Sequence, residues 1–287
     1  MGYDKPIYGI IGNPLKHSLS PLMHNAAFKE MGVDASYELF PLQEKELDNF
    51  FAELKKETSA VFGLNVTVPY KEKVIFYLDS IAPFADKAGA VNTIVITHDR
   101  KLVGYNTDGP GFIAHLSELG FNPANKTIAV LGAGGSARAI IASLCLITDR
   151  PYSIIIYNRT PERLDSLLSE LGQRLDLSCV EPARSIDDLQ IEMADMLINA
   201  TPVGLSPRDP ALVEESLLHP GMLVYDLIYN PRETVLLKMA KERGAMATNG
   251  LGMLYYQGVL SLQHWVNIQL DQKVKKKMRK SLEEAIS

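Results

Sequence analysis

Apolar positions along this chain follow two periodicities, which divide it into predicted strands and helices. Apolar residues on one face predict an amphipathic helix over 44–57, and an N-cap at Ser20, followed by Pro21, predicts another helix that runs to Gly32. Short runs rich in β-branched residues predict three strands and a hairpin in the first hundred residues, at 7–13, 36–42, 61–68, 92–97 and 102–106. This alternation predicts a largely parallel sheet covered by helices.

A second alternation begins at Ile128 and has the pattern of a nucleotide-binding domain. Thr160 and Pro161 open a helix that ends near Gly172, and after Gly250 a long amphipathic helix and a charged helix end the chain. The predicted strands are 128–131, 153–157, 177–181, 196–200 and 223–227. With a length of 287 residues, the two alternations predict an α/β protein of about two domains, the second a doubly wound, Rossmann-type domain.

The glycine turn after the strand at 128–131 has the residues that a dinucleotide requires. Gly132 permits a tight turn, Gly134 lets backbone N–H groups approach a pyrophosphate, and Ala137 lets the following helix pack closely on the strand. The pyrophosphate would lie at the helix N-terminus, where unpaired N–H groups and the dipole favour negative charge. Because glycine turns also serve as plain packing corners, this string alone is a weak signal.

The end of the next strand indicates which dinucleotide would bind. A carboxylate there would accept a hydrogen bond from the adenosine ribose 2′-OH and select NAD. This chain has Asn158 and Arg159 instead, with Arg163 one turn into the following helix. A surface arginine is often only solvated, but a polar donor and two cations at the ribose position suit a 2′-phosphate. We therefore predict NADP(H) as the cofactor.

Composition and charge argue against several other classes of protein. A hydrophobic content of 46% with 22% charged residues is ordinary for a globular protein, and a net charge of −5 gives no basic excess for nucleic acid. Arg138 and the glycines interrupt the apolar stretch 128–147, so no membrane span is predicted, and the N-terminus lacks a signal-peptide pattern. Cys145 and Cys179 lack C-x-x-C spacing, and the six histidines form no ligand pair. We expect a cytoplasmic protein without a metal, working as a monomer or a homodimer.

Motifs distributed along the whole chain give a further indication. They are His17-Ser-Leu-Ser-Pro21, Asn65-Val-Thr-Val-Pro-Tyr-Lys71, Gly89-Ala-Val-Asn-Thr93, Tyr105-Asn-Thr-Asp108, the Gly132 turn, Asn158-Arg-Thr160, Asn199-Ala-Thr-Pro-Val-Gly204 and Gly250-Leu-Gly-Met-Leu-Tyr-Tyr-Gln257. In this order and at this spacing, the chain resembles the shikimate dehydrogenase family nearly end to end. The resemblance implies a substrate-binding domain at 1–107, an NADP-binding Rossmann domain inserted at 108–249, and C-terminal helices at 250–287 that complete the first domain.

The resemblance also implies a reaction, the reversible NADPH-dependent reduction of 3-dehydroshikimate to shikimate in aromatic amino-acid biosynthesis. Hydride transfer to the ring ketone leaves negative charge on its oxygen, which a nearby cation or proton donor stabilises in the transition state. Lys71 matches the family's catalytic lysine and Asp108 its carboxylate partner, and both would also contact the substrate. On their own, a lysine after Pro-Tyr and an aspartate before glycine are typical of surface and turn positions.

The other site residues are likewise implied by the resemblance. The substrate would contact Ser18, Ser20 and Tyr229 with its carboxylate and Asn65, Thr67, Asn92 and Gln257 with its ring hydroxyls. The cofactor would contact Gly132, Ala133, Gly134, Gly135, Ser136 and Ala137 with its diphosphate, Asn158, Arg159, Thr160 and Arg163 with its 2′-phosphate, Thr201 and Val203 with its adenosine, and Leu227 and Gly250 with its nicotinamide. No role is implied for Tyr70.

Two alternative functions stay open at this point. A quinate/shikimate dehydrogenase would accept quinate and use NAD or NADP; a carboxylate after Arg159 would indicate NAD, but Thr160 stands there. A catalytically silent, NADP(H)-binding regulatory protein would keep the Gly132 turn but would need neither Lys71 nor Asp108.

Overall fold

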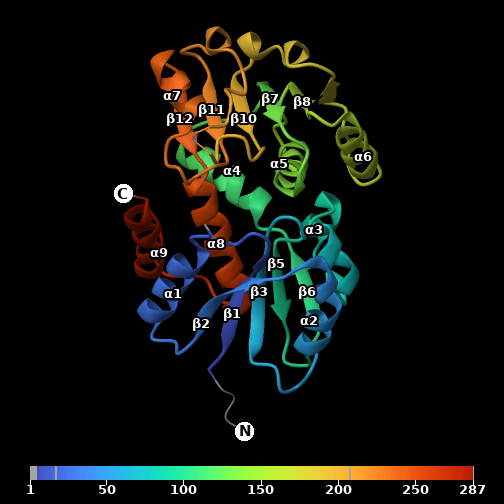
Figure 1. The fold of residues 1–287 in the computed structure, drawn as a ribbon, viewed down its shortest axis with the longest axis vertical. Helices are drawn as coiled ribbons and strands as arrows, with labels where there is room; N and C mark the ends of the chain where they lie inside the picture. The colour runs from blue at the N-terminus through green and yellow to red at the C-terminus, as the bar shows by residue number, and fades with distance from the viewer. Residues whose placement is uncertain (1–4, 17, 207, 287) are drawn as a thin grey trace. The chain divides into compact units, whose positions relative to one another are not determined.

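The computed structural model describes residues 5–16, 18–206 and 208–286, and the chain divides into two compact units (Figure 1). The first unit comprises Met1–Gly111 and Leu254–Ser287, and the second comprises Phe112–Met253. Both divisions fall inside helices, α4 (Asp108–Glu118) and α8 (Leu251–Val266). The chain therefore changes units a few residues after the predicted boundaries at 107 and 249.

The first unit contains a six-stranded mixed sheet in the order β2-β1-β3-β5-β6-β4. Its strands are β1 (Ile7–Gly12), β2 (Ser36–Pro41), β3 (Val61–Val66), β4 (Ser80–Ile81), β5 (Thr93–Ile96) and β6 (Leu102–Tyr105). β1 pairs in parallel with β2 and β3, whereas β5 runs antiparallel to both β3 and β6. The predicted hairpin is confirmed, with Ile96 opposite Leu102. A connection this short can join only antiparallel strands, which is one reason why the sheet is more mixed than predicted.

Helices of the first unit agree only in part with the prediction. They are α1 (Ser20–Met31), α2 (Leu47–Leu54), α3 (Pro83–Ala88), which was not predicted, α9 (Gln272–Ala285) and the greater part of α8. α1 stops at Gly32, which adopts a left-handed φ of 67°, but its N-cap is Leu19, so the predicted cap at Ser20 is wrong by one residue. The helix predicted at 44–57 is confirmed over its central part, Leu47–Leu54, but its predicted bounds are wrong. Gln43 and Glu46 form a reciprocal capping box around a short 3₁₀ turn, so the α-helix begins only after Glu46.

The second unit contains a sheet of six parallel strands in the order β12-β11-β10-β7-β8-β9. These are β7 (Thr127–Leu131), β8 (Ser153–Tyr157), β9 (Val180–Ala183), β10 (Met196–Asn199), β11 (Leu223–Asp226) and β12 (Met246–Asn249). The strand order reverses beside β7, as in a doubly wound nucleotide-binding sheet. The strand predicted at 177–181 begins three residues late, because a turn closed by the Asp176 side chain and by Val180 N–H to Leu177 O occupies its first positions. β12 was not predicted.

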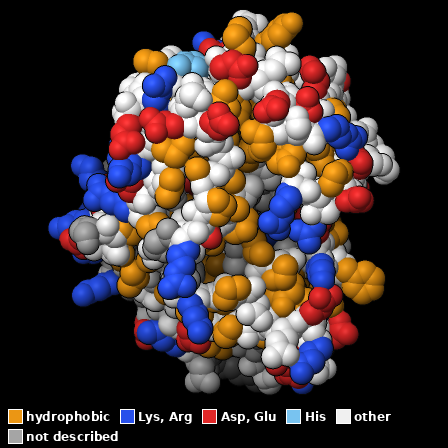
Figure 2. Space-filling view, turned by 45° about the horizontal axis from the view of Figure 1, so that its top comes forward, with side chains coloured by type: hydrophobic (Ala, Val, Ile, Leu, Met, Phe, Trp, Pro, Cys, Tyr) orange, Lys and Arg blue, Asp and Glu red, His pale blue; other side chains and the backbone are white. Residues whose placement is uncertain are grey.

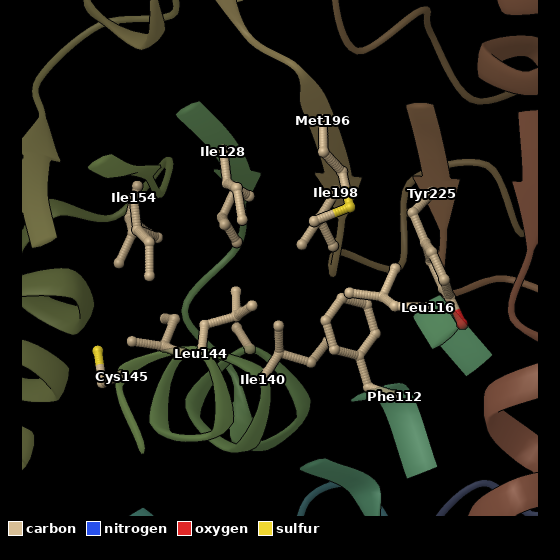
Figure 3. Close-up of a cluster of buried hydrophobic side chains, with 14 of the residues drawn as sticks. Phe112, Leu116, Ile128, Ile140, Leu144, Cys145, Ile154, Met196, Ile198 and Tyr225 are labelled. Carbon is tan, nitrogen blue, oxygen red and sulfur yellow. The ribbon is translucent and has the colours of Figure 1, made fainter. Parts of the chain in front are cut away.

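Helices cover both faces of this parallel sheet, as its apolar strands require. On one face, strand residues such as Ile128 and Ile198 point toward Ile140 and Leu144 of α5 (Gly135–Leu146) and toward Phe112 of α4 (Figure 3). α6 (Pro161–Gly172) adds leucines to the same core, and α7 (Val235–Glu242) packs on the opposite face. Since apolar packing covers both faces, polar loop residues can gather at the carboxyl ends of the strands.

The described residues lack two features that would change the interpretation of the fold. None of their helices is long and apolar enough to span a membrane. They also include no group of three or more His, Cys, Asp or Glu side chains that could hold a metal ion. On the face seen in Figure 2, acidic and basic side chains are interspersed with apolar ones, which is the pattern of an ordinary solvated surface.

His24 of α1 is a completely buried titratable group in the first unit. Its ring stacks on Tyr37 with centroids 4.5 Å apart, and neither ring nitrogen has a hydrogen-bond partner among the described residues. Burial lowers the pKa of His24 to about 3. The unfolded chain takes up this proton near pH ~6.5 and the folded chain does not, so stability is lost as the pH falls from ~6.5 toward the folded value.

We expect a His24→Phe variant to be less sensitive to acid than the wild type. Between about pH 7 and about pH 4.5, it should retain about 2–3 kcal/mol more of its free energy of unfolding, at ~1.4 kcal/mol for each pH unit below the unfolded pKa. Urea unfolding at several pH values measures this difference, and replacement of the exposed His98 by Asn is the control. Equal losses in the wild type and in His24→Phe would contradict the assignment.

Candidate functional site

Lys71 and Asp108 form a buried ion pair in the first unit. Lys71 Nζ lies 2.6 Å from Asp108 Oδ2, and the two side chains are only 9% and 8% exposed. Lys71 follows β3 in the turn that contains Pro69, and Asp108 is the first residue of α4. Since an isolated buried charge is strongly disfavoured, each of these groups depends on the other.

The hydrogen bonds of this ion pair continue into two amide side chains. Asn92 Nδ2 donates to Asp108 Oδ1 at 2.9 Å and lies 3.3 Å from Gln257 Oε1. Gln257 comes from α8, and its Nε2 donates to the carbonyl of Leu254. The structure thus brings together four predicted site residues from distant parts of the sequence.

Local packing explains why these four side chains meet. Asn106 Oδ1 accepts from the backbone N–H groups of Asp108 and Gly109 and so caps the helix that presents Asp108. Gly111 must be glycine, because a Cβ there would lie 2.7 Å from the backbone nitrogen of Gln257. Tyr70 is buried and its hydroxyl donates to Leu42 O, so this residue, which had no predicted role, anchors the turn before Lys71.

The remaining substrate-side residues of the first unit lie outside this set of four. Asn65 is buried at the end of β3 and accepts a hydrogen bond from the Tyr37 hydroxyl at 2.7 Å. Ser18 Oγ accepts from Ser20 N at 3.4 Å, and Thr67 occupies the turn between β3 and Lys71. His17, the first residue of its motif, lies outside the described residues. Tyr229 belongs to the second unit, so the structure does not place it with the set of four residues that includes Asp108.

The predicted diphosphate turn has the geometry that the sequence indicated. Gly132 adopts a φ of +107°, and a Cβ there would lie 2.9 Å from the carbonyl oxygen of Ala200, so only glycine fits. Gly134 is the N-cap of α5, and a Cβ built on it meets nothing within 4 Å. Ala137 is fully buried against the core. Ala133, Gly135 and Ser136 complete the turn, which leaves the N-terminus of α5 accessible to an anion.

Two arginines follow β8, the next strand after the Gly132 turn and α5. Arg159 and Arg163 are exposed, and neither is paired with a carboxylate in the described part of the chain. Asn158 Nδ2 donates to Thr160 O at 2.8 Å, which closes the turn before α6. The structure therefore offers two available cations where the sequence predicted a 2′-phosphate.

The loop after β10 is held by two buried polar residues that the prediction did not assign. Asn199 Oδ1 accepts from Thr201 N and Oγ1, and Asn199 Nδ2 donates to Val203 O and to Asp226 Oδ1. Asp226 also accepts from Thr234 Oγ1 at 2.6 Å. Burial raises the pKa of Asp226 above its usual value. An acidic residue at the end of an apolar strand is the sequence signal for this role. Pro207 of the same loop lies outside the described residues.

Position 250 requires glycine, because its backbone lies close to Leu227, which is predicted to contact the nicotinamide. A Cβ at this position would overlap the carbonyl oxygen of Leu227, and Gly250 N donates to Ile228 O at 3.2 Å. Leu227 N in turn donates to Asn199 O. These contacts join the ends of β10, β11 and β12 into one continuous rim.

Comparison with known proteins identifies a family. Residues 10–94 match the family described as the shikimate dehydrogenase substrate binding domain. The shikimate dehydrogenase (NADP(+)) of Moorella thermoacetica is 44% identical over 266 residues, which cover 90% of this chain and 87% of that protein.

Solved structures agree with the sequence comparison. The shikimate dehydrogenase of Aquifex aeolicus superimposes with a TM-score of 0.85 at 35% identity, covering 97% of this chain and 98% of that chain. The shikimate 5-dehydrogenase of Thermus thermophilus, in complex with NADP(H) and shikimate, gives a TM-score of 0.83 at 32% identity, covering 98% of this chain and 99% of that chain.

Proposed function

The chain belongs to the shikimate dehydrogenase family, and from this we infer that it is an NADP-dependent shikimate dehydrogenase. It reduces 3-dehydroshikimate to shikimate with NADPH, reversibly, as an oxidoreductase of the shikimate pathway. The observation that carries this conclusion from the structure is the buried pair of Lys71 and Asp108, with the amides of Asn92 and Gln257 beside it.

We propose that Lys71 is the proton donor in reduction. Charge develops on the ketone oxygen as the ring carbon is reduced, and a buried ammonium next to that oxygen is worth most in this low-polarity setting. Asp108 holds Lys71 Nζ at 2.6 Å and would accept a hydrogen bond from a neighbouring hydroxyl of the substrate. In oxidation the neutral amine of Lys71 would take the proton back from the alcohol.

Neutral donors and acceptors around this pair suit a hydroxylated ring. We propose that Asn65, Thr67, Asn92 and Gln257 recognise ring hydroxyls, and that Ser18, Ser20 and Tyr229 bind the carboxylate. Burial makes this recognition selective, because an analogue that lacks one hydroxyl leaves a buried polar group unpaired.

The cofactor-side residues fit NADP(H). When bound, NADPH supplies the hydride. The open N-terminus of α5, with the space above Gly134, would hold the diphosphate, and Arg159 and Arg163 would pair with the 2′-phosphate. The Thr201–Val203 loop and the rim at Leu227 and Gly250 would then border the adenosine and nicotinamide ends.

Initial rates test the proposed function directly. The absorbance of the reduced nicotinamide is followed with shikimate or quinate, each with NADP or NAD. We expect the highest kcat/KM for shikimate with NADP. A higher value for quinate with NAD would favour the quinate-using alternative, and binding of NADPH without any turnover would favour a regulatory protein.

We further propose that the enzyme acts in the cytoplasm as a monomer or homodimer. The support is its biosynthetic role and the absence of a disulfide between its free cysteines, Cys145 and Cys179. Light scattering across a range of protein concentrations distinguishes one protomer from two.

A further inference from the structure

Three buried hydroxyl groups contact the residues whose amides are proposed to bind the substrate. They belong to Thr93 of β5, Thr107 before α4 and Ser261 of α8, and each residue is at most 1% exposed. We propose that this hydroxyl cluster is a positioning device, which sets the orientation of the amide groups of Asn65 and Asn92 and the place of Gln257. The inference rests on the proposed function, since it concerns recognition of the same substrate.

The three hydroxyl oxygens lie within hydrogen-bond distance of one another. Thr93 Oγ1 is 2.7 Å from Ser261 Oγ and 3.2 Å from Thr107 Oγ1, and Thr107 Oγ1 is 3.1 Å from Ser261 Oγ. A hydroxyl donates one hydrogen bond and accepts up to two, so the three hydroxyls have three protons in all, which they share among themselves and with their neighbours. The cluster joins β5 and the loop before α4 to α8, which comes from the other end of the chain.

The cluster and the backbone N–H of Thr107 together orient the Asn92 amide. Asn92 Oδ1 accepts from the Thr93 hydroxyl at 3.1 Å and from the Thr107 backbone N–H at 2.7 Å. Because a carbonyl oxygen can only accept, these donors hold Oδ1 on the side of the cluster. Asn92 Nδ2 then donates to Thr107 Oγ1 at 2.9 Å and faces Asp108 Oδ1 and Gln257 Oε1.

Asn65 and Gln257 depend on the same hydroxyls. Asn65 Nδ2 lies 3.2 Å from Thr93 Oγ1 and 3.0 Å from Ser261 Oγ, while its Oδ1 accepts from Tyr37. Ser261 Oγ donates to the backbone carbonyl of Gln257 at 2.9 Å, one helical turn earlier. Through Ser261, the turn of α8 that presents Gln257 is therefore linked to the two asparagines.

Because the network is buried, the loss of one hydroxyl should have a large effect. Its partner group is left without a hydrogen bond and has no access to water, which costs more free energy than an exposed hydrogen bond contributes. An amide that has lost its partners can rotate, so the site would present a mixture of donors and acceptors to the substrate. Affinity for the substrate should suffer first, since the reacting groups Lys71 and Asp108 keep their own contact.

Thr93→Val tests the proposal, because valine has the shape of threonine without its hydroxyl. We expect kcat/KM for shikimate to fall about tenfold, mainly through KM, while KM for NADP changes less than about twofold. Thr93→Ser keeps the hydroxyl and should return kcat/KM to within about threefold of wild type. Equal losses in both variants would assign the effect to packing and overturn the proposal, as would wild-type kinetics in Thr93→Val.

Ser261→Ala provides a second test that does not depend on the folding of Thr93→Val. We expect a similar rise in KM for shikimate, and a double variant with Thr93→Val should lose less than the sum of the two effects. Ser281→Ala is the matched control, because Ser281 in α9 also donates to a carbonyl of its own helix, at 2.8 Å, outside the cluster. Full additivity, or an equal effect of Ser281→Ala, would overturn the proposal. Wild-type protein that fails to turn over shikimate would instead refute the proposed function, and the inference with it.

Discussion

Replacement of Lys71 by alanine is expected to lower the turnover of shikimate by about 10²–10⁴-fold. Lys71 Nζ is held against Asp108, and the substitution removes both the proposed proton donor and the charge proposed to stabilise the developing oxyanion. Binding of NADPH should change little, because the residues proposed for it belong to the second unit. Steady-state kinetics and a titration of NADPH fluorescence measure the two effects separately.

The controls for this variant separate chemistry from stability. Removing one member of a buried ion pair destabilises by about 3–5 kcal/mol, so the melting temperature of Lys71→Ala should also fall. Adding Asp108→Asn removes the stranded carboxylate and should recover part of that stability without recovering turnover. Lys73→Ala is the matched surface control, since Lys73 pairs with Glu44 at 46% exposure. Turnover that survives in Lys71→Ala would exclude the proposed role.

Long periodic segments and glycine stops made most of the fold predictable. The strands around the Gly132 turn and the stop of α1 at Gly32 were predicted because apolar periodicity and local backbone requirements agree there. β4 and β12 were missed because each is short and barely apolar. β12 forms because it pairs with β11, where Met246 lies opposite Leu223. The local sequence pattern does not predict such a pairing.

The candidate site was predictable only where a motif contained the residue. Spacing does not reveal that Lys71 and Asp108 meet; their contact follows from β3, α4 and the turn that Tyr70 anchors. Thr93 and Thr107 stand inside motifs but received no role, and Ser261 lies outside every motif. One signal was available for Ser261: it follows Gln257 by one helical turn, so the two residues share a face of α8.

Replacement of Arg159 by alanine is expected to change cofactor preference. KM for NADP should rise about ten- to a hundredfold, because a charge-assisted contact with the 2′-phosphate contributes about 1.5–3 kcal/mol. KM for NAD should stay within about threefold of wild type, since NAD carries no phosphate at that position. Initial rates with both cofactors at saturating shikimate give the ratio.

Position, and not merely positive charge, should determine the size of this effect. Arg159 and Arg163 follow β8, whereas Arg150 precedes it and is already paired with Asp176 at 2.7 Å. Arg150→Ala therefore removes the same charge from the same unit and should leave the NADP-to-NAD ratio unchanged. Added salt should weaken NADP binding in the wild type more than in Arg159→Ala, because a solvent-exposed cation is screened. An equal rise in KM for both cofactors in Arg159→Ala would mean that the guanidinium supports the fold of the loop and does not bind the phosphate.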